Sequence, residues 1–369
     1  MKWLYGILCL FFLIVFHEFG HFLAAKLFGV KVESFSIGFG PILLHRNVHG
    51  TDYRLSLIPL GGYCGMKGEK DFQKAVEMNL TEISADKDSL YGIHPLKRAL
   101  IGFAGPFFNF IFAVIACAFI NGIGYIYYTY SNRIIINDSV PTSAARDAGI
   151  ISGDKIIAIN GKAISDFSDL VEEVSIRPDQ DLEITVDRDG KELSFNIHTG
   201  MDKSTGSGQL GVAADTSEVL EKESVRYGFF GSIIHGFLDA CNTVAVTIRS
   251  IGILFKGIDL DKAISGPARI TEMLGSTVKE GFAESFRIGF ISLMSLLSVI
   301  SVSLFIMNLL PVPILDGGII LIAFIEIIIR RRINPRIQYY VQFIGLAFIA
   351  LLFIIGLKGD ILFFLNRGN

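Results

Sequence analysis

Two histidines and a glutamate lie in an otherwise apolar stretch near the N-terminus, as His17, Glu18 and His21. Residues four apart on a helix share a face, so both imidazoles can reach one ion. Glu18 lies close enough to act on a metal-bound water. Imidazole and carboxylate ligands in a four-coordinate site favour zinc. We predict a zinc centre rather than packed, hydrogen-bonded histidines, because ionisable groups within a membrane span usually mark function.

A catalytic zinc site needs a third protein ligand and one position for water. Asp316, in the run NLLPVPILDGG, is the best candidate, since broken backbone at membrane depth is tolerated where it lines a cavity. The alternative for Asp316 is an ordinary helix N-cap before Gly317. Asn308, which begins the run, could cap, pack or hydrogen-bond a substrate backbone. Glu33 is too close in sequence to fold back onto the ion.

Four apolar stretches approach the length of about 20 residues that a membrane-spanning helix needs. They cover residues 4–27, 99–122, 288–310 and 338–357. With 51% hydrophobic residues, the chain is too apolar for an ordinary soluble domain. We expect the first stretch to be retained, because the ionisable residues at its far end do not resemble a signal-peptide cleavage site.

A fifth apolar stretch, residues 229–248, is interrupted by glycine, histidine and aspartate. Cytoplasmic loops carry an excess of lysine and arginine. This rule is satisfied if residues 28–98 and 330–337 face the cytoplasm, which leaves both termini and residues 130–285 outside. A fifth span would put the arginines of RRRINPR outside, so we predict that this stretch is an interfacial amphipathic helix.

The soluble parts carry two β-rich patterns. Residues 31–63 predict strands with a turn near His49, and Pro59 with the glycine pair at Gly61 is expected to end the second strand. This pattern fits a small sheet on the membrane equally well as a sheet edge that pairs with an extended peptide.

Residues 132–215 predict a compact domain with a hairpin at Asp189. Its run GDKIIAINGKAI, which leads into a turn at Asn160, is similar to a PDZ domain. For this domain we favour a role in substrate access over tight peptide binding.

The net charge and the cysteine spacing argue against a nucleic-acid-binding protein and against a disulfide-stabilised or thiol-metal protein. The net charge of −3 offers no basic surface, so we expect no nucleic-acid partner. The four cysteines form no CxxC pair, so we predict neither a thiol metal site nor a disulfide framework.

Five features follow one another along the chain: HEFGH, IPLGGY, GFAGPFFNF, one PDZ-like domain and NLLPVPILDGG. Together they resemble the site-2 protease family of intramembrane zinc metalloproteases, and most closely the bacterial regulator of sigma-E protease group. Some members of the family have tandem PDZ domains, whereas this chain has one. Relatives often carry a histidine after LDGG, where this chain has Ile319.

The resemblance implies roles for individual residues. The zinc ligands would be His17, His21 and Asp316, with Glu18 as general base. Asn308 would lie near the bound substrate strand, and residues 53–63 would receive the substrate. The substrate-binding candidates in that element are Leu55, Leu57, Pro59, Gly61 and Gly62. Asn109, in GFAGPFFNF, could hydrogen-bond across helices.

We therefore expect a polytopic α-helical membrane protein with four transmembrane helices, a membrane-associated β-hairpin or sheet and one inserted extracytoplasmic PDZ-like α+β domain. The expected parts are transmembrane helix 1 (1–28), a cytoplasmic β-rich segment and loop (29–96), transmembrane helix 2 (97–124), the PDZ-like domain (130–216), amphipathic helices (220–285), transmembrane helix 3 with the LDG segment (286–330) and transmembrane helix 4 (338–358).

The resemblance implies an intramembrane zinc metalloprotease of the bacterial cytoplasmic (inner) membrane, with HExxH near the cytoplasmic side. A zinc-bound water would be the nucleophile. The substrates would be single-span membrane proteins, such as anti-sigma factors or remnant signal peptides, already trimmed by an upstream site-1-type protease.

Two alternatives are a non-catalytic zinc-binding scaffold with a PDZ recruitment domain and a metal transporter. A structural site normally has four protein ligands, and only three are found in the sequence. A transporter would be expected to have more than one polar span.

Overall fold

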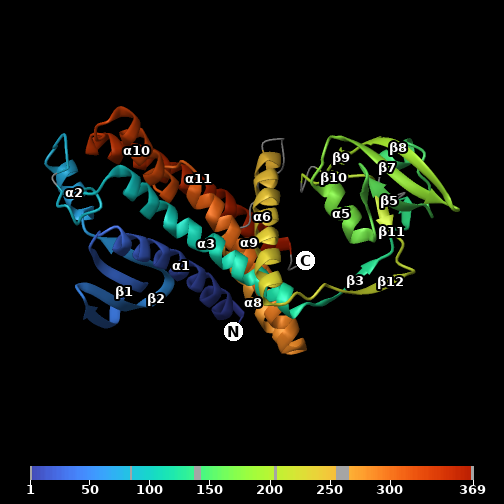
Figure 1. Ribbon diagram of the computed structural model, residues 1–369, viewed down its shortest axis with the longest axis horizontal. Coiled ribbons are helices and arrows are strands. Elements are labelled where there is room, and N and C mark those ends of the chain that lie inside the picture. Colours follow the sequence, from blue (N-terminus) through green and yellow to red (C-terminus); the bar gives the residue numbers. More distant parts are fainter. Residues whose placement is uncertain (1, 84, 137–142, 203–205, 255–265, 367–369) are drawn as a thin grey trace. The chain divides into compact units, whose positions relative to one another are not determined.

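The computed structural model describes residues 2–83, 85–136, 143–202, 206–254 and 266–366 (Figure 1). The chain divides into two compact units. The first unit comprises Met1–Gly122, Gly228–Val244 and Ser265–Asn369, and the second comprises Ile123–Tyr227 and Ala245–Ile264. The metal-binding candidates all belong to the first unit.

Within the described residues, five helices are long and apolar enough to cross a membrane. They are α1 (Lys2–Leu27), α3 (Pro95–Ile123), α6 (Phe229–Leu254), α9 (Phe286–Leu309) and α11 (Pro335–Asn366). Four of them match the predicted apolar stretches, so the protein is a multi-pass membrane protein. The fifth, α6, contains the stretch that was predicted to be interfacial. A Cβ at Gly236 of α6 would lie 2.6 Å from the Ala118 nitrogen, so this glycine allows α6 to pack closely on α3.

Helices α1, α3 and α9 run side by side and share an apolar core (Figure 1). Leu13, Phe112 and Leu297 meet there, one from each helix. A short helix, α8 (Pro267–Glu284), packs on the start of α1, where Lys2 pairs with Glu272 at 2.8 Å. After α9 the chain bends through a proline-containing segment into α10 (Asp316–Ile329). The bundle therefore places the end of the predicted LDG segment beside α1 and α3.

Two long strands, β1 (Val32–Val48) and β2 (Thr51–Met66), form a sheet next to α1 (Figure 1). The expectation that Pro59 and the glycine pair end the second strand is wrong, because β2 continues to Met66. The strand bends instead: Gly61 has a φ of 145°, which a residue without a Cβ adopts readily. Residues 62–66 consequently pair with β1 at residues 32–37, which also pair with residues 52–55.

A helix absent from the predicted elements, α2 (Glu69–Glu77), follows the sheet in the polar loop.

The second unit is an α+β domain. It contains β3 (Ile126–Tyr130), β4 (Ile134–Ile136), α4 (Ala144–Asp147), β5 (Lys155–Ile159), β6 (Lys162–Ala163), α5 (Phe167–Ser175), β7 (Asp181–Arg188), β8 (Lys191–His198), β9 (Gly200–Met201), β10 (Gly208–Gln209), β11 (Val212–Ala214) and β12 (Val219–Glu223). Its largest sheet has the order β6-β5-β7-β8, and the predicted hairpin at Asp189 joins β7 to β8. Ile156, Leu170 and Ile184 are fully buried in its core. The PDZ classification stays a prediction.

Candidate metal centre

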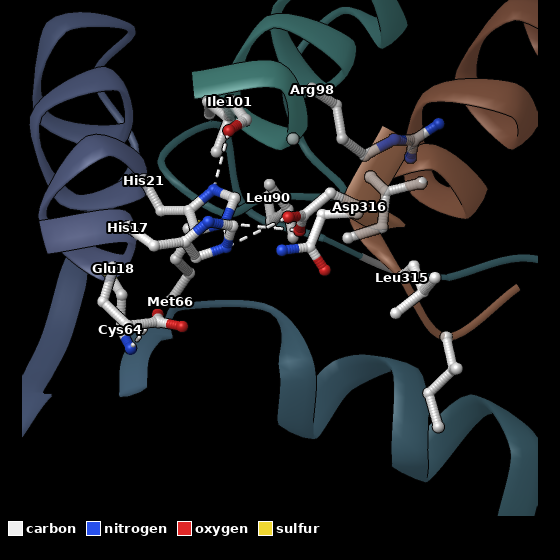
Figure 2. Close-up of a pocket in the computed structure, with 14 residues that line it drawn as sticks. His17, Glu18, His21, Cys64, Met66, Leu90, Arg98, Ile101, Leu315 and Asp316 are labelled. Carbon is white, nitrogen blue, oxygen red and sulfur yellow. Dashed lines mark hydrogen bonds and ion pairs between the residues drawn. The ribbon is translucent and has the colours of Figure 1, made fainter. Parts of the chain in front are cut away.

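His17, His21 and Asp316 converge from two helices on one point (Figure 2). The Nε2 atoms of the two imidazoles are 3.2 Å apart. The Asp316 carboxylate lies beside both, with Oδ2 3.1 Å from Nε2 of His17 and Oδ1 3.3 Å from Nε2 of His21. In the part of the chain that the structure describes, this is the one group of histidine, cysteine and acidic side chains that could share an ion.

The local sequence explains where these side chains point. Helix α1 continues unbroken through His17 and His21, so the four-residue spacing places both on one face. Asp316 is the first residue of α10, and Leu315 takes the N-cap position without a side-chain cap. The N-cap alternative for Asp316 therefore does not describe its position. A Cβ at Gly317 would lie 2.1 Å from the Leu310 carbonyl oxygen, so glycine is required for this tight entry into α10.

Helix α3 supplies the surface on which both histidines rest. Nδ1 of His21 donates a hydrogen bond to the carbonyl oxygen of Ile101 at 2.8 Å, which leaves Nε2 free to bind a metal. Nδ1 of His17 lies 3.1 Å from the side-chain amide of Asn109. Between these two contacts, Gly105 leaves room for the rings, since a Cβ there would be 2.2 Å from Nε2 of His21.

Glu18 lies next to the three candidate ligands and is held by the sheet. Its Oε2 accepts a hydrogen bond from the backbone N–H of Cys64 in β2 at 3.1 Å. Glu18, Cys64 and the candidate ligands line one cavity of about 320 Å³. Figure 2 shows the glutamate and the cysteine on the side of the two imidazoles away from Ile101. A carboxylate therefore stands beside the ligands, in a cavity with room for a substrate group.

Only one of the predicted substrate-binding residues lies in the cavity. Asn308 lines the cavity. The five candidates of the β-element do not line it, and Leu55 pairs on both sides, with Ile37 and Leu44. The strand that reaches the cavity is the one after the bend, through Cys64 and Met66. Within the described residues no further strand pairs with this segment, so it forms one edge of the sheet, and residues 42–48 form the other.

Several cavity residues were missed by sequence reasoning. They include Cys64, Met66, Arg98, Ile101 and Gly102. Ile101 acts through a backbone carbonyl, which leaves no signal in a sequence. Cys64 and Met66 could have been found only by extending the second strand beyond the glycine pair.

The donor set fits zinc. Two imidazole nitrogens and one carboxylate are typical zinc ligands, whereas calcium and magnesium prefer oxygen ligands alone. The Ile101 carbonyl orients one imidazole from behind, as carbonyls do at metal-binding histidines. Three protein ligands leave a fourth position for a water or a substrate, as in catalytic rather than structural zinc sites.

Comparison with known proteins identifies relatives along nearly the whole chain. The model of the family described as "Peptidase family M50" matches residues 5–352. A protein of Treponema pallidum, named as a candidate zinc metalloprotease, is 35% identical over 98% of this chain and 99% of its own length. A protein of Campylobacter jejuni with the same kind of name is 34% identical over 98% of this chain and 93% of its own.

Proposed function

This chain belongs to peptidase family M50 and is a metalloprotease, and from that premise we propose that it uses zinc to cleave peptide bonds within the membrane. The observation that carries the proposal is the convergence of His17, His21 and Asp316 beside Glu18, with both histidines and Glu18 on α1, a helix that is apolar enough to span a bilayer. Ionisable groups in such helices usually serve function.

The chain's own residues would divide the chemistry between them. His17, His21 and Asp316 would hold the zinc ion. Zinc, when bound, lowers the pKa of a coordinated water to about 7 and polarises a carbonyl group. Glu18 would take the proton of the attacking water and deliver it to the leaving amine nitrogen. The hydrogen bond from Cys64 keeps the Glu18 carboxylate on the cavity wall while it does so.

An extended substrate would bind along the sheet edge at residues 62–66. A helical substrate hides its carbonyl groups in intrahelical hydrogen bonds, so it must unwind before cleavage. Pairing with a strand edge would offset the lost hydrogen bonds. Cys64 and Met66 lie both on this edge and in the cavity, and Asn308 of α9 lines the same cavity. The proposed contact thus narrows the predicted element 53–63 to its last residues, which include Gly62, and extends it to Met66 at the end of β2.

Contacts at one end of the first unit support the proposed orientation. Arg332 donates to the Tyr91 carbonyl, and Arg336 donates to the Asn79 carbonyl at 2.8 Å. The arginine-rich loop and residues 79–91 are thus at the same end, which we propose faces the cytoplasm. His17 and His21 lie in the part of α1 nearer that end. The site would then open near the cytoplasmic side of a bacterial inner membrane.

A contact at the opposite end of the first unit supports four membrane-spanning helices. Phe119, near the end of α3, contacts Phe290, near the start of α9, with ring centroids 5.9 Å apart. The chain therefore leaves and re-enters the bundle on one side. A crossing by α6 would need a second crossing to return, and α8, the described helix that follows, is not apolar enough for one. The PDZ-like domain between these points would be extracytoplasmic.

The proposed substrates are single-span membrane proteins, of the anti-sigma factor or remnant signal peptide type, after an upstream site-1-type protease has trimmed them. The scaffold alternative is disfavoured by the three-ligand site. A structural zinc site would have a fourth protein ligand, and in the described residues none joins the other three.

The test is cleavage of a single-span reporter by purified protein in detergent. Glu18→Gln should retain bound zinc and lower the cleavage rate about 10²–10⁴-fold, the usual contribution of a general base. Glu33→Gln is a matched control, because Glu33 is exposed on β1 and outside the cavity. Cleavage by Glu18→Gln at the wild-type rate would refute the proposed role of Glu18. Wild-type protein without bound zinc would refute the proposed function.

A further inference from the structure

Asn109 is a buried polar residue that the proposed chemistry leaves unexplained. Its side chain is 1% exposed in the middle of the apolar helix α3. Its Nδ2 lies 3.1 Å from Nδ1 of His17, while its Oδ1 is buried without a hydrogen-bond partner. A buried polar atom without a partner is rare and calls for an explanation.

The metal role of His17 supplies that explanation. A histidine that binds a metal through Nε2 carries its hydrogen on Nδ1, and that N–H needs an acceptor. For His21 the acceptor is the Ile101 carbonyl. At His17 the amide at that position belongs to Asn109. An amide nitrogen facing Nδ1 would oppose two donors, whereas rotating the amide by 180° brings the unpartnered oxygen to Nδ1.

Resting on the proposed function, we infer that Asn109 is a positioning residue for the zinc site, and that its Oδ1 accepts the Nδ1 hydrogen of His17. Ile101, Gly105 and Asn109 are spaced four residues apart, so one face of α3 serves both histidines. The carbonyl of Ile101 holds His21, Gly105 makes room for both rings, and Asn109 holds His17. A hydrogen bond from Ser301 to the backbone carbonyl of Asn109, at 2.8 Å, ties this turn of α3 to α9.

Two substitutions of nearly equal size separate this role from packing. Asn109→Leu removes the acceptor, and Asn109→Asp retains one. Outer hydrogen-bond partners of metal-binding histidines typically contribute 10–100-fold to metal affinity. The zinc Kd, measured by chelator competition in detergent, should therefore rise about 10–100-fold in Asn109→Leu and stay within about threefold of wild type in Asn109→Asp. A packing role predicts the opposite order, because leucine is favoured over aspartate in an apolar helix interface.

Asn121→Leu is the matched control. Asn121 is also on α3, but it hydrogen-bonds the Cys117 carbonyl and the Asp239 carboxylate and contacts neither histidine. Its zinc Kd should equal that of wild type. The absorption spectrum of the Co²⁺-substituted protein gives a second readout, and it should change in Asn109→Leu alone.

The outcomes distinguish two failures. If wild-type protein binds zinc and Asn109→Leu binds it equally well, the inference is overturned and the proposed function stands. If wild-type protein binds no zinc, the proposed function fails and this inference fails with it. If Asn109→Leu does not fold, Asn109→Asp decides, because loss of zinc from the folded Asn109→Asp variant would contradict the acceptor role.

Discussion

A missing side chain sets how closely α3 approaches the two histidines. A Cβ at Gly105 would lie 2.2 Å from Nε2 of His21 and 2.8 Å from Cε1 of His17. Alanine is favoured over glycine within a helix by about 1 kcal/mol, so Gly105→Ala should not weaken α3 itself. It should displace both rings and lower the zinc content of the purified protein. Gly252→Ala, on helix α6, is the control, since a Cβ there would meet nothing within 4 Å. Equal zinc in the two variants would contradict this account.

At the same scale, sequence reasoning reached some residues and not others. His17, Glu18 and His21 were predictable because a helix places them together whatever surrounds it. Asp316 lies almost 300 residues later, and only its apolar, proline-rich context and the family resemblance indicated it. The contact between Asn109 and His17 was not predictable. Helix α3 is apolar on every face, so its hydrophobic periodicity does not indicate which face packs against α1.

At the scale of elements, one buried ion pair fastens α10 to α3. Arg98 and Glu326 pair directly and are 2% and 3% exposed. Glu326 also accepts a hydrogen bond from the backbone of Ile333 at 3.0 Å. Removing one partner of a buried pair typically costs about 3–5 kcal/mol, because the other charge is left uncompensated. Arg98→Met should lower the free energy of unfolding by about that amount.

The double substitution Arg98→Met with Glu326→Leu should recover most of that loss, since two apolar side chains leave no buried charge. Unfolding in detergent of wild type, both single variants and the double variant gives the coupling free energy. Additive losses in the double variant would show that the pair does not fasten the two helices.

The sheet shows what a strand pattern cannot predict. Alternation and the turn at His49 gave two strands, and both exist. Pro59 and the glycine pair at Gly61 predict the end of the second strand. In the structure the strand bends there instead, and the chain returns along the other side of β1. Whether a glycine pair ends or bends a strand depends on a partner being available, which local sequence does not contain. The bend matters because it brings Cys64 to Glu18.

At the scale of the whole molecule, the second unit has ionic contacts that make its stability depend on pH. Burial acts to raise the pKa of the Asp154 carboxyl, but two hydrogen bonds from Arg188, at 2.7 and 2.8 Å, outweigh it and hold that pKa below its ordinary value. The same balance, with Lys222 as the partner, lowers the pKa of Asp166. A carboxyl group with a lowered pKa in the folded state stabilises the fold above its unfolded pKa, near 3.9. That stabilisation is lost as the pH falls through the folded pKa.

We therefore predict that the second unit loses this part of its stability as the pH falls below about pH 4. Hydrogen exchange of residues 123–227 in the full chain, corrected for the pH dependence of the chemical exchange rate, measures this. Asp154→Asn should lower protection at pH 7 and flatten the acid-induced loss, because asparagine does not titrate. Glu192→Gln, at an exposed position on β8, should leave both unchanged. An unchanged acid profile in Asp154→Asn would show that this ion pair does not control the acid stability of the unit.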